Sequence, residues 1–218
     1  MADRMIDTLY ASMPWDELDA VVFDIGNVLV GMDEHEVLAD MFPDDPATRE
    51  AVLRHTCRSP YWHMLDSAAM DLETCVRAMA ENDPRMEAPV RRFMTGWPEY
   101  RRPVEEGVAA ARACKRHGKK LYQLSNYPAE YHARNVRDYP FFALFDGAVI
   151  SSHVRMLKPR FEIYRYLTDT YGLEPSRTLF IDDNAANIEA ALALGWHGFC
   201  MNAPGKLAAF IGEEEKDA

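Results

Sequence analysis

The chain has 218 residues, of which 48% are hydrophobic and 27% charged, and its 24 basic and 35 acidic residues give a formal net charge of -11. This composition is typical of a globular protein rather than a disordered or collagen-like one. The acidic balance argues against nucleic acid and anionic membrane surfaces as partners, because both attract basic patches. The length allows one large domain, or a core with a modest insertion.

Targeting segments and cysteine pairs are not recognisable in the sequence. No stretch approaches the roughly 18 apolar residues of a membrane span, and residues 1–18 lack the basic and apolar regions of a secretory signal. We therefore expect a cytoplasmic protein. The four cysteines are widely spaced, which predicts reduced core thiols rather than a zinc site or disulfides. They are Cys57, Cys75, Cys114 and Cys200.

Short apolar runs alternate with helical patterns along most of the chain, which is typical of a parallel sheet with crossover helices. We predict strands at 20–24, 120–125, 148–151, 178–182 and 197–201. Helical spacing predicts helices at 104–117, 130–137, 161–171 and 187–194. The expected fold class is α/β, a doubly wound, parallel, five-stranded Rossmann-like sheet.

Residues 32–103 interrupt this alternation. They carry helical patterns without a convincing strand, and a crossover needs only about a dozen residues. We therefore predict an α/β core at 1–31 and 104–218, and an inserted helical cap at 32–103 over one end of the sheet. Several cap residues are candidates for substrate contact, although packing against the sheet is the more common role of such side chains. These candidates are Tyr61, Trp62, His63, Trp97, Tyr100, Arg101 and Arg102.

Polar residues follow four of the predicted strands. In chain order they are Asp24 with Gly26 and Asn27, Ser125 with Asn126, Lys158 beyond the third strand, and Asp182 with Asp183. Ligands of open parallel sheets bind in the crevice at the carboxyl ends of the strands. We therefore expect these residues to converge, although they are far apart in the sequence.

These residue types suit phosphoryl transfer. Asp24 ends an apolar strand that holds it rigidly, as a carboxylate nucleophile that forms an acyl-phosphate requires. Gly26 and Asn27 form a turn whose backbone can approach a phosphate. Ser125 and Asn126 offer a hydroxyl and backbone N–H donors to the same anion.

Charge neutralisation is the expected task of the remaining residues. Lys158 would neutralise charge between the nucleophile and the phosphoryl group. Asp182 and Asp183, together with Asp24, form an all-oxygen donor set that suits Mg²⁺. Taken singly, each residue also fits an ordinary turn, loop or helix N-cap. Such independent roles do not account for a carboxylate, a hydroxyl, a cation and a carboxylate pair in this order.

The motifs around these residues resemble those of the haloacid dehalogenase-like superfamily, from residue 20 to about residue 202. FDIGNVLV resembles the first motif with Asp24 as nucleophile, and LYQLSNYP resembles the second with Ser125 as phosphate ligand. LKPRFEIY resembles the third with Lys158, and FIDDNAANIEAALALGWHGF resembles the fourth with Asp182 and Asp183 at the metal site. The insert lies where that family's small cap domain lies.

The resemblance implies a Mg²⁺-dependent phosphatase that forms an aspartyl-phosphate on Asp24 and acts on a small phosphorylated metabolite. The forms FDxGNVLV and DDNxxNI are similar to those of bacterial sugar-phosphate phosphatases of the α-glucose-1-phosphate type. Catalysis would then involve Asp24 and Lys158. Phosphate would contact Gly26, Asn27, Ser125, Asn126 and Lys158, and the metal would contact Asp24, Gly26, Asp182 and Asp183.

One position departs from the family pattern. Family phosphatases usually carry a second Asp two residues after the nucleophile, as general acid and base, and here that residue is Gly26. Gly26 offers a metal its backbone carbonyl but cannot transfer a proton, and such assistance is worth about 10²–10⁴-fold. Three outcomes are open: leaving groups that need little protonation, replacement by a residue such as Asp33 or His35, or feeble hydrolysis.

Two alternative functions follow from the same residues. A catalytically weak or inactive protein that binds a phosphorylated ligand is compatible with Gly26. A haloacid dehalogenase would use the same Asp24, but the acidic pair Asp182 and Asp183 argues against it, because the family's dehalogenases need no metal and have a non-acidic fourth motif.

Overall fold

The computed structural model describes residues 17–202 together with residues 205 and 207. Residues 1–16, which belong to the segment that lacks the features of a secretory signal, lie outside the described residues. Five parallel strands form one sheet in the order β5-β4-β1-β6-β7. The predicted α/β class and all five predicted strands are confirmed. The strands are β1 (Ala20–Phe23), β4 (Lys120–Ser125), β5 (Gly147–Ile150), β6 (Thr178–Asp182) and β7 (His197–Cys200).

The central strand β1 is buried along its whole length, as its sequence AVVF requires. Successive side chains of a strand point to opposite faces of a sheet. Val21 and Phe23 accordingly belong to one hydrophobic cluster, and Ala20 and Val22 belong to the other. Burial on both faces is what a strand between two layers of helices needs.

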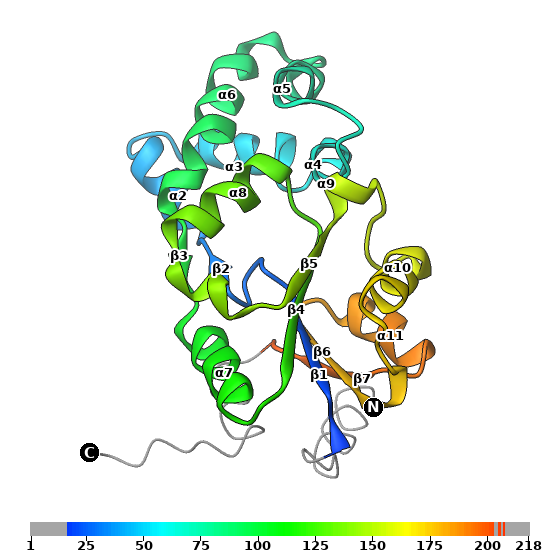
Figure 1. Cartoon of the computed structure of the whole chain (residues 1–218). Coiled ribbons are helices and arrows are strands. Elements are labelled where there is room, and N and C mark those ends of the chain that lie inside the picture. Colours follow the sequence, from blue (N-terminus) through cyan, green and yellow to red (C-terminus); the bar gives the residue numbers. More distant parts are fainter. Residues whose placement is uncertain (1–16, 203–204, 206, 208–218) are drawn as a thin grey trace, which may run out of the picture.

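Helices cover both faces of the sheet (Figure 1). The first layer contains α7 (Glu105–Arg116), which packs against β4, and the second contains α10 (Phe161–Tyr171) and α11 (Ala185–Ala193). The helix α8 (Ala129–Asp138) follows β4, and the short α9 (Ser151–Val154) follows β5. The four helices predicted for this part of the chain are thus present, with ends shifted by no more than two residues.

The inserted segment is helical and lies over the carboxyl end of the sheet (Figure 1). Four of its helices begin at a residue whose side chain accepts a backbone N–H, which is the signature of an N-cap. The division into core and cap at residues 32 and 103 stays a prediction. The helices are α2 (Glu34–Met41), α3 (Pro46–His55), α4 (Pro60–Asp66), α5 (Leu72–Ala80) and α6 (Glu87–Gly96). Short 3₁₀ turns occur at Pro84–Met86, Trp97–Tyr100, Pro140–Leu144 and Pro175–Arg177.

A two-stranded antiparallel ribbon joins the start and the end of the insert. It pairs β2 (Val30–Gly31) with β3 (Arg102–Pro103). Sequence analysis expected no strand near this boundary, because strands of two residues are too short to show an alternating pattern. Because of this ribbon, the chain enters and leaves the insert at adjacent positions, directly after the loop that follows β1.

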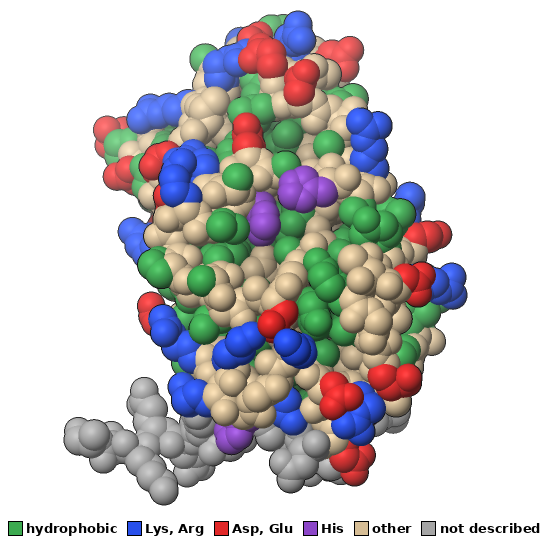
Figure 2. Space-filling view, in the orientation of Figure 1, with side chains coloured by type: hydrophobic (Ala, Val, Ile, Leu, Met, Phe, Trp, Pro, Cys, Tyr) green, Lys and Arg blue, Asp and Glu red, His purple; other side chains and the backbone are tan. Residues whose placement is uncertain are grey.

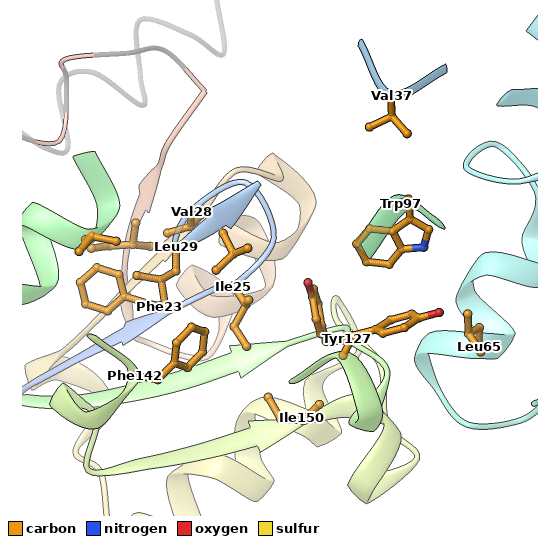
Figure 3. Packing of buried hydrophobic residues seen from close by; sticks show 14 of the residues in the cluster. Phe23, Ile25, Val28, Leu29, Val37, Leu65, Trp97, Tyr127, Phe142 and Ile150 are labelled. Atoms are coloured by element: carbon orange, nitrogen blue, oxygen red, sulfur yellow. The ribbon is translucent and has the colours of Figure 1, made fainter. Parts of the chain in front are cut away.

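One hydrophobic cluster runs from the sheet into the insert. Figure 3 shows Phe23 and Phe142 near the sheet, and Trp97 and Leu65 on the side of the insert, with Tyr127 between them. The loop after β1 packs closely against α7 at Gly107. A Cβ at Gly107 would clash with the carbonyl of Val28, so only glycine permits this approach. The loop that follows Asp24 therefore has little freedom.

Charged side chains are mixed over the surface drawn in Figure 2, and the cysteines are thiols, as their spacing predicted. Figure 2 shows acidic and basic side chains interspersed over the face drawn. Cys75, Cys114 and Cys200 are buried thiols and Cys57 is half-buried. Within the described residues, no helix is both long and apolar enough to cross a membrane.

Candidate active site

Asp24 lies directly after the central strand, between the ends of β4 and β6. Its backbone N–H donates to the carbonyl of Ile181 at 2.9 Å, and its carboxylate Oδ1 accepts the N–H of Ile25 at 2.7 Å. The residue is 7% exposed. Burial raises the pKa of Asp24 to about 7, while the nearby Lys158 opposes the rise. Asp24 is thus a rigid carboxylate that needs positive charge beside it to stay ionised.

Lys158 supplies a buried positive charge between two carboxylates. Its Nζ lies 2.9 Å from Oδ1 of Asp24 and 2.6 Å from Oδ2 of Asp182. Burial lowers the pKa of Lys158, but the charges of Asp182 and Asp24 raise it above its ordinary value. Lys158 therefore stays protonated, and it occupies Oδ1 of Asp24, which leaves Oδ2 for a reaction partner.

Asn126 holds the loop that carries Lys158. Its Oδ1 accepts the backbone N–H of Lys158 at 2.9 Å, and its Nδ2 donates to the carbonyl of Lys158 at 3.0 Å. Both polar atoms of this side chain are therefore engaged with the protein. The role predicted for Asn126 as a phosphate ligand stays a prediction, and it rests on the backbone rather than on the amide.

The two acidic residues after β6 have different surroundings. Asp182 is fully buried, and its oxygens accept Nζ of Lys158, the N–H of Asn184 at 2.8 Å and Nδ2 of Asn187 at 3.0 Å. Asp183 is less buried, and its Oδ2 accepts Nδ2 of Asn27 at 3.0 Å. Burial and the charge of Asp182 raise the pKa of Asp183, while Asn27 opposes the rise.

Asn187 is a site residue that the sequence reasoning did not single out. The signal was present in the DDNxxN spacing, because α11 begins at residue 185 and Nδ2 of Asn187, in its first turn, donates to Asp182 at the end of β6.

Asn27 also has a role that the sequence did not predict. Its backbone is left-handed, with φ of 55°, a conformation that Asn tolerates. In this position the Asn27 amide donates to Asp183 and links the loop after β1 to the end of β6.

A cation fits the carboxylates at this crevice. One oxygen each from Asp24, Asp182 and Asp183 lies within 4.8 Å of the others. An all-oxygen, carboxylate-rich set is what Mg²⁺ prefers. The contacts of Asp182 with Lys158 and Asn187 leave Asp24 and Asp183 as the more available ligands. The predicted metal contact of the Gly26 carbonyl stays a prediction.

Ser125 offers a donor at the same crevice. Its Oγ is buried and forms no hydrogen bond of ordinary length among the described residues. The hydroxyl nevertheless lies close enough to Asp24 to lower the pKa of that carboxyl group. A hydroxyl at the end of β4 beside the nucleophile suits a phosphate oxygen, although the phosphate contact of Ser125 stays a prediction.

A pocket of about 190 Å³ opens between the crevice and the insert. The rings of Trp62 and Trp97 lie 5.8 Å apart in its wall. The indole N–H of Trp97 is buried and has no partner within the described part of the chain. The lining residues are Gly26, Asn27, Val30, Gly31, Met32, Trp62, Asp66, Trp97, Arg101, Asn126, Tyr127 and Pro128.

Three of the seven cap candidates from the sequence line this pocket: Trp62, Trp97 and Arg101. Arg101 is buried and its guanidinium is engaged, with Nε donating to the carbonyl of Pro98 at 2.6 Å and further contacts to Asn135 and Asp138 of α8. It therefore fastens the end of the insert to the core. The other four candidates are absent from the lining, and they are Tyr61, His63, Tyr100 and Arg102.

The residues considered as replacements for the missing general acid lie elsewhere. Asp33 and His35 are exposed, and neither lines the pocket. The Asp33 carboxylate caps α2 by accepting the N–H groups of His35 and Glu36. Asp66, in contrast, does line the pocket, and no pattern in the sequence distinguished it.

The parallel sheet, the buried lysine between two carboxylates and the helical insert define a class of hydrolase. A family model described as haloacid dehalogenase-like hydrolase matches residues 18–195. The chain therefore belongs to the haloacid dehalogenase-like hydrolases, as its motifs predicted. A curated relative, the sesquiterpene phosphatase astK of Aspergillus oryzae, is 32% identical over 98 residues, which are 44% of this chain. The matched part covers 50% of the length of that relative.

Solved structures share the fold. The HAD family enzyme bt-2542 of Bacteroides thetaiotaomicron, as a mutant in complex with magnesium and inorganic phosphate, is 18% identical with a TM-score of 0.70, covering 90% of this chain and 100% of that one. The L-2-haloacid dehalogenase of Xanthobacter autotrophicus with covalently bound chloropropionic acid is 17% identical with a TM-score of 0.64, covering 88% and 81%. At these identities the likeness concerns the fold.

Proposed function

We propose that the protein is a Mg²⁺-dependent phosphatase that transfers the phosphoryl group of a small phosphorylated metabolite to Asp24. The observation that carries this proposal is the convergence of Asp24, Asp182 and Asp183 around the buried cation of Lys158. A dehalogenase would not need this many carboxylates at its nucleophile. The relative named as a phosphatase supports the same reaction class.

The chain's own residues have distinct tasks in this reaction. Oδ2 of Asp24 attacks phosphorus while Lys158 holds Oδ1 and offsets the negative charge that accumulates. Ser125 donates its hydroxyl to a phosphate oxygen, and Asn126 keeps Lys158 in place. Asp24 and Asp183 would hold the metal, which supplies the positive charge that lets an ionised carboxylate approach a phosphate.

The alcohol part of the substrate would occupy the pocket below the insert. Two indole rings and Tyr127 form an apolar wall there, and the indole N–H of Trp97 is available as a donor. This wall suits an alcohol with an apolar face. Sugar phosphates, which the sequence resemblance favours, present such a face together with hydroxyl groups that accept hydrogen bonds.

Hydrolysis of p-nitrophenyl phosphate and a panel of sugar and prenyl phosphates tests the proposal. We expect activity that EDTA abolishes and Mg²⁺ restores, and that Asp24→Asn reduces by at least about 10³-fold, because the nucleophile is lost. Asp169→Asn, an exposed carboxylate on α10, is the matched control and should leave activity unchanged. Activity that persists in Asp24→Asn or after chelation would contradict the mechanism.

The alternative function, ligand binding without turnover, gives a different result in the same preparation. It requires a protein that is inactive on the whole panel, yet is stabilised against heat by one of the phosphate esters. The absence of a side chain at Gly26 is the observation that favours it.

A further inference from the structure

Asp66 is a buried carboxyl group in the wall of the pocket. It is the last residue of α4 in the insert and is 5% exposed. The same pocket is lined by Gly26, where family phosphatases carry their proton-transferring side chain. The insert therefore places a carboxyl group in the cavity from which a carboxyl group is missing on the core.

The core holds the backbone of Asp66 firmly. Ser151 donates its hydroxyl to the Asp66 carbonyl at 2.5 Å, and the same hydroxyl accepts the N–H of Tyr127 at 2.9 Å. Ser151 follows β5 and Tyr127 follows β4. The end of α4 is thus tied to two strand ends beside the crevice.

The Asp66 side chain, in contrast, lacks a strong partner among the described residues. The nearest basic atom on its own helix is Nδ1 of His63 at 3.9 Å, and the His63 side chain is 70% exposed. Asp24 and Lys158 are the charged groups that act on Asp66 from the core. Burial, with the charge of Asp24, raises the pKa of Asp66 well above its ordinary value, and Lys158 opposes the rise. Burial therefore favours the protonated form of this carboxyl group, which is the form that a general acid needs.

Space for a proton donor exists beside Gly26, and the backbone does not require glycine there. A Cβ built on Gly26 meets no atom within 4 Å. Residues with left-handed backbone occur at Asn27 and elsewhere, but Gly26 is not among them. Neither the space around a Cβ nor the backbone conformation therefore excludes a side chain at residue 26.

We propose that Asp66 is the general acid and base of this enzyme, in the place of the side chain that Gly26 lacks. The inference rests on the proposed phosphatase function. When Oδ2 of Asp24 bonds to phosphorus, the bond from phosphorus to the alcohol oxygen breaks, and that oxygen takes the proton of Asp66. The Asp66 carboxylate then accepts a proton from the water that attacks phosphorus, which releases phosphate, frees Asp24 and restores protonated Asp66.

Leaving groups of different basicity test this proposal. Asp66→Asn should lower kcat/KM for alkyl phosphates by about 10²–10⁴-fold, because alkoxides need protonation. The same variant should retain kcat/KM for p-nitrophenyl phosphate within about tenfold, because nitrophenolate leaves without a proton. Asn has nearly the shape of a protonated Asp, so the fold should persist, and the melting temperature checks this.

Two further variants make the test specific. Asp33→Asn is the matched control, because Asn caps a helix as well as Asp does and Asp33 lies outside the pocket. It should leave both substrates unaffected. In the background of Asp66→Asn, Gly26→Asp should restore alkyl phosphate hydrolysis by at least about tenfold, since it returns a carboxyl group to the same cavity.

The outcomes separate this inference from the proposed function. A native protein that hydrolyses no phosphate ester would overturn the proposed function, and the inference with it. A native protein that hydrolyses both esters, with Asp66→Asn affecting them equally or not at all, would overturn the inference alone.

Discussion

The crevice at the end of the sheet is lined by charged side chains, whereas the insert contributes aromatic rings to the wall of the pocket. In the crevice, Lys158 is held between Asp24 and Asp182, and the oxygens of Asp182 accept further donors. In the wall, Trp62 and Trp97 present rings, with one indole N–H unmatched in the described structure. Buried charges fix the position of reacting atoms, whereas an apolar wall excludes water and accommodates an alcohol of suitable shape.

This difference predicts which region controls stability and turnover, and which controls substrate affinity. Removal of the buried cation from the crevice leaves two carboxylates without their partner, so it should affect both stability and turnover. A change in the aromatic part of the wall removes contact area, so it should affect substrate affinity alone. Three substitutions test this contrast.

Lys158→Met removes the buried cation while keeping most of its volume. The carboxylates of Asp24 and Asp182 then face each other without compensation, and we expect turnover to be lost and the free energy of unfolding to fall by about 3 kcal/mol without metal. Urea denaturation measures the loss. Lys115→Met is the matched control, because Lys115 forms an exposed ion pair with Asp146 at 2.8 Å, and such pairs contribute about 1 kcal/mol or less. Equal losses in the two variants would remove the distinction.

Asp183→Asn weakens the metal site and spares the fold. Asn keeps an oxygen that can accept Nδ2 of Asn27, but it lacks the charge that attracts a cation. We expect the Mg²⁺ concentration for half-maximal activity to rise by at least about tenfold, as it does when even an outer partner of a metal ligand is lost. The melting temperature without metal should change little. A large fall in that temperature would indicate that Asp183 serves the turn rather than the metal.

Trp62→Ala enlarges the pocket on the side of the insert. We expect KM for the best phosphate ester to rise about tenfold, equivalent to about 1.4 kcal/mol, with kcat within twofold of the native value. Tyr166→Ala removes an aromatic side chain that is 42% exposed on α10 and serves as the control. If kcat rather than KM falls in Trp62→Ala, the aromatic rings of the wall take part in the chemistry and the contrast between the regions fails.

The sheet and the order of its polar strand ends were predictable because both are local in the sequence. A buried strand such as AVVF, and a motif such as DDNxxN, are contiguous, and parallel strands bring their carboxyl ends to one edge whatever the connections. The ribbon of β2 and β3 was not predictable, because two residues have no periodicity.

The types of residue that reach the crevice could be predicted from the sequence, because they follow the strands directly. The bonds that each of them forms depend on the tertiary structure. The side chain of Asn27 bonds to Asp183 and that of Asn126 to the Lys158 backbone, while their predicted phosphate contacts stay predictions. Asp66 is an ordinary helix-terminal Asp in the sequence, and only the packing of α4 on the strand ends buries its carboxyl group in the pocket. Burial arises from contacts between distant segments, so no local pattern encodes it.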